Sequence, residues 1–430
     1  MKPFVLAIDG PAGAGKSVTA RGVAARLGLL HVDSGAMYRA AAWIASLAGA
    51  DLSSEEAVLR AIRAVRFDVG PDGLLVDGRP VGTEIRTAEA GEAASRVALH
   101  PRLRRRLVQL QRRLARSPGI VMEGRDIGTV VFPGADLKIY FSASVEARAR
   151  RRRDELVARG ETADLASIEA MVRDRDERDV GRIESPLRPA PDAIPLDTTD
   201  LTLEEQVDLA SHWAGLALRG GSPLTPFYWF GSRFVRYFSR TALRFRMEGF
   251  EHVPRTGPLI VASNHISFWD PPLIGSNFPR VLHFLAKAEL FQNKVFGAML
   301  RGYNSIPIQR GPQARSGLRG AEEALNRGGA VLIFPEGTRN KSGALLPPRA
   351  GIGRLAAVTR APVLPVRITG SNRIRRSMLR RVVVRIACGP LLMPPLHVEG
   401  SREAEHAYAC RVMDAIAALH PEGRKDPGWK

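Results

Sequence analysis

The residues best suited to chemistry in the first half of the chain form a glycine-rich loop that ends in a lysine and a serine. The loop follows the apolar run 4–8, precedes the helical pattern 18–27 and has the spacing G-x4-G-K-S. Glycines let successive backbone N–H groups converge on a phosphate, and the helix N-terminus adds its positive dipole end. Lys16 would neutralise a transferring phosphoryl group and Ser17 would hold Mg²⁺. The sequence therefore predicts a phosphate and metal site made of Gly10, Pro11, Ala12, Gly13, Ala14, Gly15, Lys16 and Ser17.

Three further segments of the first half place arginines beside carboxylates. They are 33–39, 123–133 and 173–182. Guanidinium groups suit the charge that develops on phosphoryl oxygens. For the last segment, a solvated helix face with i,i+4 ion pairs remains an alternative interpretation.

Together these motifs resemble the bacterial cytidylate kinase family across nearly all of residues 1–218. The phosphate loop is followed in order by the D-S-G-A-M-Y-R, G-R-D-I-G-T-V-V-F-P and R-D-E-R-D-V-G-R segments. The resemblance implies phosphoryl transfer from ATP, with Mg²⁺, to CMP or dCMP. It also implies an α/β fold of the P-loop nucleoside monophosphate kinase type. In that fold helices flank a parallel sheet, and a small β-rich insert would span about residues 65–97.

The resemblance also assigns roles to single residues. Ser34, Ser95, Arg104 and Asp126 would bind cytosine, whose exocyclic amine can donate to a carboxylate. Arg39 and Arg125 would hold the acceptor phosphate, and Arg175, Asp179 and Arg182 would contact the ribose and the transferring phosphate. The catalytic set would be Lys16, Arg125, Arg175 and Arg182. The arginine-rich run 148–153 corresponds to the lid that closes over ATP, although an exposed basic helix fits it equally well.

The second half carries a histidine and an aspartate five residues apart at the end of an apolar run. His265 and Asp270 follow the run 259–262, and a carboxylate can fix the imidazole tautomer so that its other nitrogen accepts a hydroxyl proton. Alone the pattern is weak. A second apolar run, 331–334, ends in P-E-G-T-R, which offers an arginine and a small turn to an anion.

These segments resemble the glycerophospholipid acyltransferases, specifically the 1-acylglycerol-3-phosphate acyltransferases. The family's N-H-x4-D, arginine-ended, F-P-E-G-T-R and proline-centred apolar boxes occur in order at 264–270, 302–310, 334–339 and 363–366. The resemblance implies a separate α/β acyltransferase domain. This domain would transfer an acyl group from acyl-CoA or acyl carrier protein to lysophosphatidate, giving phosphatidate. His265 would be the general base and Asp270 its partner. The acceptor would contact Arg310, Glu336, Gly337, Thr338 and Arg339.

Charge is concentrated in the second half. Residues 221–430 hold 31 Lys and Arg against 13 Asp and Glu, which accounts for nearly all of the net charge of +19. We expect a helix over 227–245 with arginines on one stripe (233, 236, 240, 244) and phenylalanines on another (227, 234, 238, 245). This layout favours an anionic membrane surface, and an ordinary packed helix is the alternative. No nucleic-acid module is recognised, so no nucleic-acid partner is expected.

The segment 219–226 contains two glycines and two prolines and predicts a boundary between domains 1–220 and 221–430. The chain begins without a signal-peptide pattern, and its two cysteines suit a reducing compartment. We therefore expect a cytoplasmic protein with peripheral contact to the inner face of the membrane. The favoured hypothesis is a bifunctional enzyme. The alternative is an active kinase tethered by a catalytically silent, lipid-binding acyltransferase-like domain.

Overall fold

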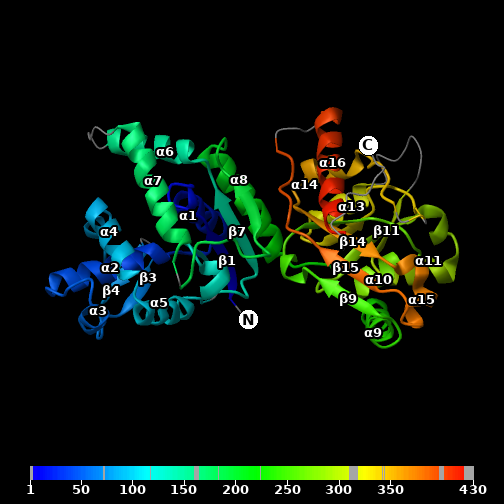
Figure 1. Ribbon diagram of the computed structural model, residues 1–430, viewed down its shortest axis with the longest axis horizontal. Helices are drawn as coiled ribbons and strands as arrows, with labels where there is room; N and C mark the ends of the chain where they lie inside the picture. The colour runs from blue at the N-terminus through cyan, green and yellow to red at the C-terminus, as the bar shows by residue number, and fades with distance from the viewer. Residues whose placement is uncertain are drawn as a thin grey trace. The chain divides into compact units, whose positions relative to one another are not determined.

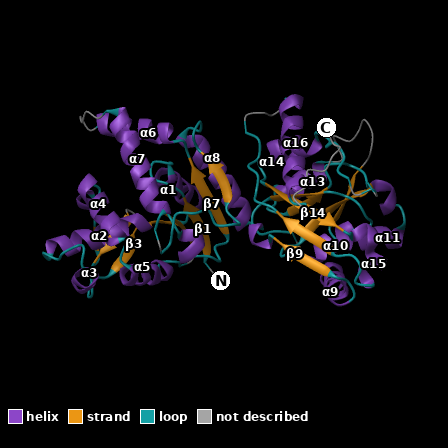
Figure 2. Cartoon of the chain, viewed as in Figure 1, coloured by secondary structure: helices purple, strands orange, loops and turns teal. Residues whose placement is uncertain are grey.

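The computed structural model describes residues 3–70, 73–116, 118–158, 164–182, 184–222, 224–308, 318–340, 342, 344–396 and 401–420. The chain divides into two compact units, Met1–Ala214 and Gly215–Lys430 (Figure 1). Each unit is built around its own large sheet (Figure 2). The predicted α/β class, with a separate second α/β domain, is confirmed. The exact boundary at residue 220 stays a prediction.

The first unit is built on a five-stranded parallel sheet in the order β2-β6-β1-β7-β8. Its strands are β1 (Phe4–Asp9), β2 (Leu30–Asp33), β6 (Gly119–Gly124), β7 (Leu137–Ser142) and β8 (Ile194–Asp197). β1 and β6 are buried at every position, as expected for central strands covered on both faces. The carboxyl ends of parallel strands meet at one edge, so the loops after β1, β2 and β6 lie together there.

Helices surround this sheet. They are α1 (Lys16–Leu27), α2 (Ser34–Leu47), α3 (Glu55–Ala61), α4 (Ala88–Val97), α5 (Pro101–Arg113), α6 (Val145–Val157), α7 (Leu165–Val180) and α8 (Leu203–Leu218), with the short turns η1 (Thr83–Ile85) and η2 (Ile127–Val131). α6 and α7 pack side by side (Figure 1).

The insert expected at 65–97 is only partly β-structure. Its strands β3 (Phe67–Gly70), β4 (Gly73–Val76) and β5 (Arg79–Pro80) form a small antiparallel sheet. The remainder is η1 and α4, and α4 packs against α2.

The second unit is built on a seven-stranded sheet in the order β12-β11-β13-β10-β14-β15-β9. Its strands are β9 (Phe245–Glu248), β10 (Leu259–Ser263), β11 (Leu282–Lys287), β12 (Ser305–Ile308), β13 (Ala330–Ile333), β14 (Val363–Thr369) and β15 (Val384–Cys388). All neighbours are parallel except the antiparallel pair β14 and β15. The adjacent strands β13, β10 and β14 therefore end at the same edge.

The helices of this unit are α9 (Pro226–Thr241), α10 (Asp270–Asn277), α11 (Lys294–Gly302), α13 (Arg319–Leu325), α14 (Gly351–Thr359), α15 (Ile374–Met378) and α16 (Arg402–Ala418), with turns η3 (Phe250–His252), η4 (Ala288–Phe291) and η5 (Ser371–Arg373). α14 and α16 lie on one side of the sheet, and α9 and α10 lie on the other (Figure 1). The core on the first side contains residues of β10, β13, α13, α14 and α16.

The helix expected over 227–245 ends earlier than predicted. α9 stops at Thr241, and Phe245 begins β9, which pairs in parallel with β15. Pairing with a distant strand outweighs the local helical periodicity here. Among the described residues, no helix combines the length and apolarity needed to cross a membrane.

Candidate functional site

The phosphate loop joins β1 to α1 in a conformation that requires glycine. Gly13 and Gly15 have φ values of 76° and 88°, in the left-handed region, and Gly15 caps α1. Lys16 is buried, and its Nζ donates to the carbonyl of Pro11 at 2.6 Å. Burial, together with the positive charge of Arg125, lowers the pKa of Lys16 to about 7. A bound polyanion would reverse this effect, so the loop has the electrostatics of an anion site.

A buried carboxylate that the motif analysis did not single out lies beside Ser17. The Ser17 hydroxyl donates to Glu123 Oε2 at 2.6 Å, and His31 lies 3.1 Å from Glu123 Oε1. The sheet topology explains the position of Glu123, because β6 is the parallel neighbour of β1 and ends beside the phosphate loop. A hydroxyl and one carboxylate suit Mg²⁺, which usually takes its other ligands from phosphates and water. Ser17 and Glu123 therefore fit the predicted metal.

Residues expected to bind cytosine lie on α2, α4, α5 and the segment after β6. The Ser34 hydroxyl donates to the carbonyl of Glu123 at 2.7 Å, and half-buried Ser95 lies on α4. Arg104 and Asp126 form a buried ion pair at 2.6 Å, and the Arg104 guanidinium lies over the Tyr38 ring. Arg39, expected to hold a phosphate, donates to Asp33 at 2.7 Å.

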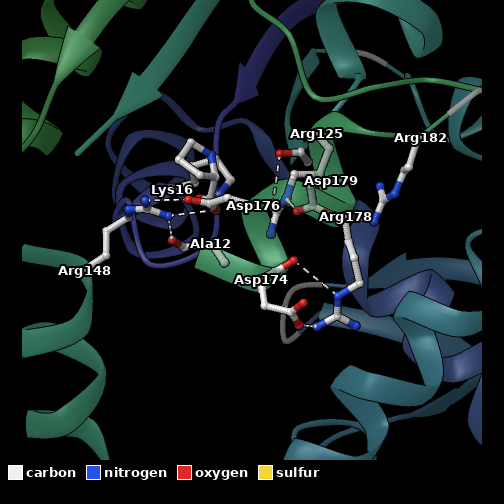
Figure 3. Close-up of polar contacts among 11 residues, drawn as sticks. Ala12, Lys16, Arg125, Arg148, Asp174, Asp176, Arg178, Asp179 and Arg182 are labelled. Atoms are coloured by element: carbon white, nitrogen blue, oxygen red, sulfur yellow. Dashed lines mark hydrogen bonds and ion pairs between the residues drawn. The ribbon is translucent and has the colours of Figure 1, made fainter. Parts of the chain in front are cut away.

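The remaining predicted phosphate contacts gather around α7 (Figure 3). Asp179 is buried and accepts from Arg125 Nε at 2.8 Å and from Arg182. Although burial opposes it, Arg125 and Arg182 hold the pKa of the Asp179 carboxyl below its usual value. Loss of water around its guanidinium, with the nearby charge of Arg125, lowers the pKa of Arg175 to about 10, although its side chain reaches solvent. Arg125 and Arg175 thus present mutually repelling positive charge that a phosphate would stabilise.

Asp9, the last residue of β1, is a second carboxylate that sequence reasoning missed. Its two oxygens accept from the backbone N–H groups of Ile127 and Gly128, each at 2.7 Å. Burial raises the pKa of Asp9 to about 6 despite these bonds. Asp9 therefore ties the strand that precedes the phosphate loop to the segment that carries Arg125 and Asp126.

The outer side of the phosphate loop is held by α6 and by the end of β8. Arg148 donates to the carbonyl of Ala12 at 3.3 Å, and Arg151 lies 3.5 Å from that of Gly13. The Thr198 hydroxyl donates to the carbonyl of Ala14 at 3.0 Å. The first arginine of the expected lid is therefore buried against the loop, whereas Arg152 and Arg153 form exposed pairs with acidic residues of their own helix.

The second unit brings His265 and Asp270 together. Their side chains meet at 2.9 Å between Nδ1 and Oδ2, and the imidazole stacks on Phe334 at 4.0 Å between ring centroids. Asp270 is fully buried and also accepts from the backbone of Ile266 and Ser267, each at 2.7 Å. Because Nδ1 faces a carboxylate oxygen, this contact suits the tautomer with Nδ1–H, in which Nε2 can accept a proton.

Two residues that follow the neighbouring strands β10 and β14 support this dyad. The Asn264 side chain donates to the carbonyl of Ile368 and accepts from its N–H, which extends the pairing of β10 with β14. The Ser371 hydroxyl, just beyond β14, donates to Asp270 Oδ1 at 2.5 Å. Ser371 was missed because a serine in a turn carries no pattern of its own.

The residues expected to bind the acyl acceptor differ in exposure. Glu336 is buried, and its two oxygens accept from the backbone N–H groups of His265 at 3.0 Å and Leu346 at 3.1 Å. Burial raises the pKa of Glu336 to about 7. Gly337 has φ of 67°, with Arg349 packed where a side chain would start. Thr338 and Arg339 are exposed.

Arg339 lies over the ring of Phe268, inside the His265 to Asp270 segment. Arg310 lies outside the described residues. The roles of this set in binding the acceptor stay predictions.

The aromatic face of α9 contains only two of the four expected phenylalanines, Phe227 and Phe234. Phe227, Phe230, Phe234 and Tyr237 are 59, 69, 71 and 70% exposed, and they lie within about 80° of helix surface. Phe238 instead stacks on Trp269, and Phe245 belongs to β9.

Two family models match the chain. The model described as cytidylate kinase matches residues 6–214, and the model described as acyltransferase matches residues 244–369. A cytidylate kinase from Citrifermentans bemidjiense is 44% identical over 209 residues, which are 48% of this chain and 90% of that protein. One from Mycolicibacterium paratuberculosis is 49% identical over 209 residues, which are 47% of this chain and 92% of that protein.

Among solved structures, the 1-acyl-sn-glycerophosphate (LPA) acyltransferase PlsC from Thermotoga maritima matches with a TM-score of 0.36 and 27% identity. The match covers 48% of this chain and 79% of that one.

Proposed function

Because this chain belongs to the cytidylate kinase family through residues 6–214 and also carries an acyltransferase domain, we propose that it is a bifunctional enzyme. Its first unit would phosphorylate CMP or dCMP with ATP. Its second unit would transfer an acyl group from acyl-CoA or acyl carrier protein to lysophosphatidate. The observation that carries the first activity is that Arg125 and Arg175 lie close enough to Lys16 of the phosphate loop to add to the effect of burial in lowering its pKa, while Arg182 shares Asp179 with Arg125.

In the kinase reaction, this chain contributes positioning and positive charge. The backbone N–H groups of the loop and Lys16 would bind the donor phosphates. Arg125, Arg175 and Arg182 would surround the transferring group, where charge accumulates. Mg²⁺, held through Ser17 and Glu123, supplies charge neutralisation on the phosphates when bound. The lowered pKa values of Lys16 and Arg175 support this assignment, because a bound anion relieves the repulsion that contributes to them.

Selectivity for cytosine would come from Asp126 and its surroundings. A carboxylate can accept from the exocyclic amine of cytosine, whereas the carbonyl oxygen of uracil at that position would face a second acceptor. Arg104 orients Asp126 through their buried pair. Ser34 and Ser95 would complete the contacts to the base.

The acyl transfer would proceed by direct attack on the thioester. His265 Nε2 would take the proton of the acceptor's 2-hydroxyl while its oxygen attacks the acyl carbon. The thiolate would then leave and take the proton back from the imidazolium, giving an ester and a free thiol. Buried Asp270 would stabilise the imidazolium, and this dyad is the observation that carries the second activity. Arg339, with Arg310, would bind the phosphate of the acceptor.

The experiment for both activities uses the full-length protein and two reciprocal variants. CMP phosphorylation and lysophosphatidate acylation are measured with wild type, Lys16→Met and His265→Ala, and acylation is measured with each donor in parallel. We expect each variant to lose one activity by at least about 10²-fold and to keep the other. Acylation that is absent from wild type with both donors, beside normal kinase activity, would favour the alternative of a silent, lipid-binding second unit.

We also propose that α9 lies on an anionic membrane surface. Its exposed aromatic residues would enter the acyl region, and Arg233 and Arg240 on the flank would meet lipid phosphates. The end of α9 contacts the segment around α15. Arg244, just after α9, donates its N–H to the carbonyl of Ser377 at 3.4 Å, and Arg380, just after α15, donates to the carbonyl of Thr241 at 3.4 Å.

The test is sedimentation with vesicles of phosphatidylcholine alone or with phosphatidylglycerol. We expect binding only to the anionic vesicles, reduced at least tenfold in Phe230→Ser/Phe234→Ser. The matched control is Val358→Ser, an exposed apolar position on α14. Equal binding by the double variant and wild type would exclude this face.

A further inference from the structure

A buried arginine of α6 joins the phosphate loop to α7. Arg148 is 4% exposed, and its Nη1 and Nη2 bond the two carboxylate oxygens of Asp176 at 2.9 and 2.6 Å (Figure 3). Its Nη1 also reaches the carbonyl of Ala12, and its Nε donates to that of Ala143 at 3.1 Å. These bonds use four of the five donors of a guanidinium group. In this arrangement, Arg148 is therefore committed to protein groups.

The loop rests directly on this side chain. A Cβ atom built on Gly13 would lie 3.2 Å from Arg148 Cβ, so loop and side chain are in close packing. A displacement of Arg148 would therefore also shift the carbonyl groups of the phosphate loop.

The other end of the contact lies on α7, the helix that carries Arg175 and Asp179, two of the residues predicted to contact the substrate. Asp176 follows Arg175 directly, and Asp179, one turn further on, bonds Arg125 and Arg182. Successive turns of α7 are thus tied to the donor loop through Asp176 and to the acceptor segment through Asp179. Because a helix is stiff over one turn, fixing Asp176 also fixes Arg175 and Asp179. Arg182 lies just beyond the end of the helix and is held through its bond to Asp179.

We propose that the Arg148–Asp176 ion pair is a positioning device that sets Arg175 and, through Asp179, Arg182 against the donor phosphates. This inference rests on the proposed kinase function and adds two residues to it, neither of which needs to touch substrate. The geometry favours this role over simple stabilisation of a surface. The pair is bidentate and buried at Arg148, and it joins two helices to a loop. A bidentate pair fixes orientation as well as distance.

The same helix provides a matched control. Arg178 and Asp174 form an ion pair at 2.8 Å within α7, and their side chains are 51 and 67% exposed. This pair is also drawn in Figure 3, and its ion-pair contact stays within one helix. It has the same chemistry as the Arg148–Asp176 pair, but both of its members lie on α7.

The test measures kcat and KM for ATP and CMP in full-length Asp176→Asn, Arg148→Lys and the double variant, each below its own melting temperature. We expect kcat to fall about 10- to 100-fold with both KM values changed less than about threefold, because misplacement affects the transition state most. The double variant should lose no more than the worse single variant, since one contact is removed in each case. Asp176→Glu, which keeps the charge, should recover part of kcat. Asp174→Asn should stay within about twofold of wild type.

The outcomes distinguish failure of the proposed kinase function from failure of the positioning role. An inactive wild-type protein would refute the proposed kinase function itself. An active wild type with Asp176→Asn and Arg148→Lys no slower than Asp174→Asn would refute only the positioning role, as would losses that multiply in the double variant. If Asp176→Asn does not fold, Arg148→Lys and Asp176→Glu are compared with the control in the same way.

Discussion

Replacing Asp126 by Asn tests a residue that we expect to contribute both to the stability of the first unit and to its choice of nucleotide. The Asp126 and Arg104 side chains are 8 and 5% exposed and joined at 2.6 Å, and Arg104 also donates to the carbonyl of Ala98. Asn keeps the size of the side chain and one acceptor oxygen but removes the negative charge. The guanidinium would then be buried without its counter-charge.

The magnitude follows from that burial. Removing one partner of a buried ion pair costs about 3–5 kcal/mol, and the oxygen that Asn retains preserves part of the contact. We therefore expect the free energy of unfolding to fall by about 2–3 kcal/mol. For a domain of this size, that corresponds to a melting temperature lower by about 5–10 °C. Asp68→Asn is the control, because its pair with Arg116 is about half exposed and should contribute less than about 1 kcal/mol.

The same variant should change selectivity. An amide can donate to the carbonyl oxygen of uracil, so we expect kcat/KM for CMP to fall about 10²-fold and its ratio to the value for UMP to narrow by about tenfold or more. Thermal unfolding and steady-state kinetics with both nucleotides measure the two effects. A melting temperature within 1 °C or so of wild type would refute the reasoning about burial. An unchanged CMP to UMP ratio would refute the role of Asp126 in binding the base.

Three further predictions concern backbone strain, the dyad and pH. In Gly15→Ala, the added Cβ would lie 2.3 Å from Gln206 Oε1, at a φ of 88°. The free energy of unfolding should therefore fall by at least about 1–2 kcal/mol, and kcat/KM for ATP should fall as well. A variant as stable and as active as wild type would contradict this. Ser371→Ala removes one donor to Asp270 and should slow acyl transfer about tenfold at unchanged KM, whereas a structural effect alone would lower only the melting temperature. The raised pKa of Glu336 means that its contribution to stability is fully present below pH of about 4.5 and is lost as pH rises through about 7. The free energy of unfolding of wild type, measured relative to that of Glu336→Gln in denaturant titrations, should therefore fall by about 3 kcal/mol between pH 4 and 8. If the difference between the two proteins does not change with pH, burial does not raise the pKa of Glu336.

Sequence patterns predicted the parts of both sites that are local in the chain. The phosphate loop could be placed because strand, glycine loop and helix are contiguous, and His265 could be paired with Asp270 because only four residues separate them. Glu123 and Ser371 could not be predicted in the same way. Glu123 reaches Ser17 across 106 residues, and Ser371 reaches Asp270 across 101. Both contacts depend on which strands become neighbours, which periodicity does not reveal.

The predicted extent of the helix over 227–245 was wrong for a related reason. Helical periodicity continues in the sequence to residue 245, but the chain leaves the helix because β9 gains a partner in β15. Tertiary pairing overrides local propensity when the two compete. The same departure moved Phe245 off the expected aromatic stripe, and Phe230 and Tyr237 lie on the exposed face instead.

In both units, buried carboxylates and cationic side chains have different roles. Asp9, Asp270 and Glu336 are buried, and each accepts from backbone N–H groups of a loop that carries predicted site residues. A carboxylate bound to two or more N–H groups fixes a loop more firmly than an apolar contact, because each bond has a direction. Arg175 and Arg339 differ from these acids because they reach solvent, and burial of the cation Lys16 lowers its pKa to about 7. Removing one of these acids should therefore disturb the geometry of a site, whereas removing one of these cations should weaken the binding of a phosphate.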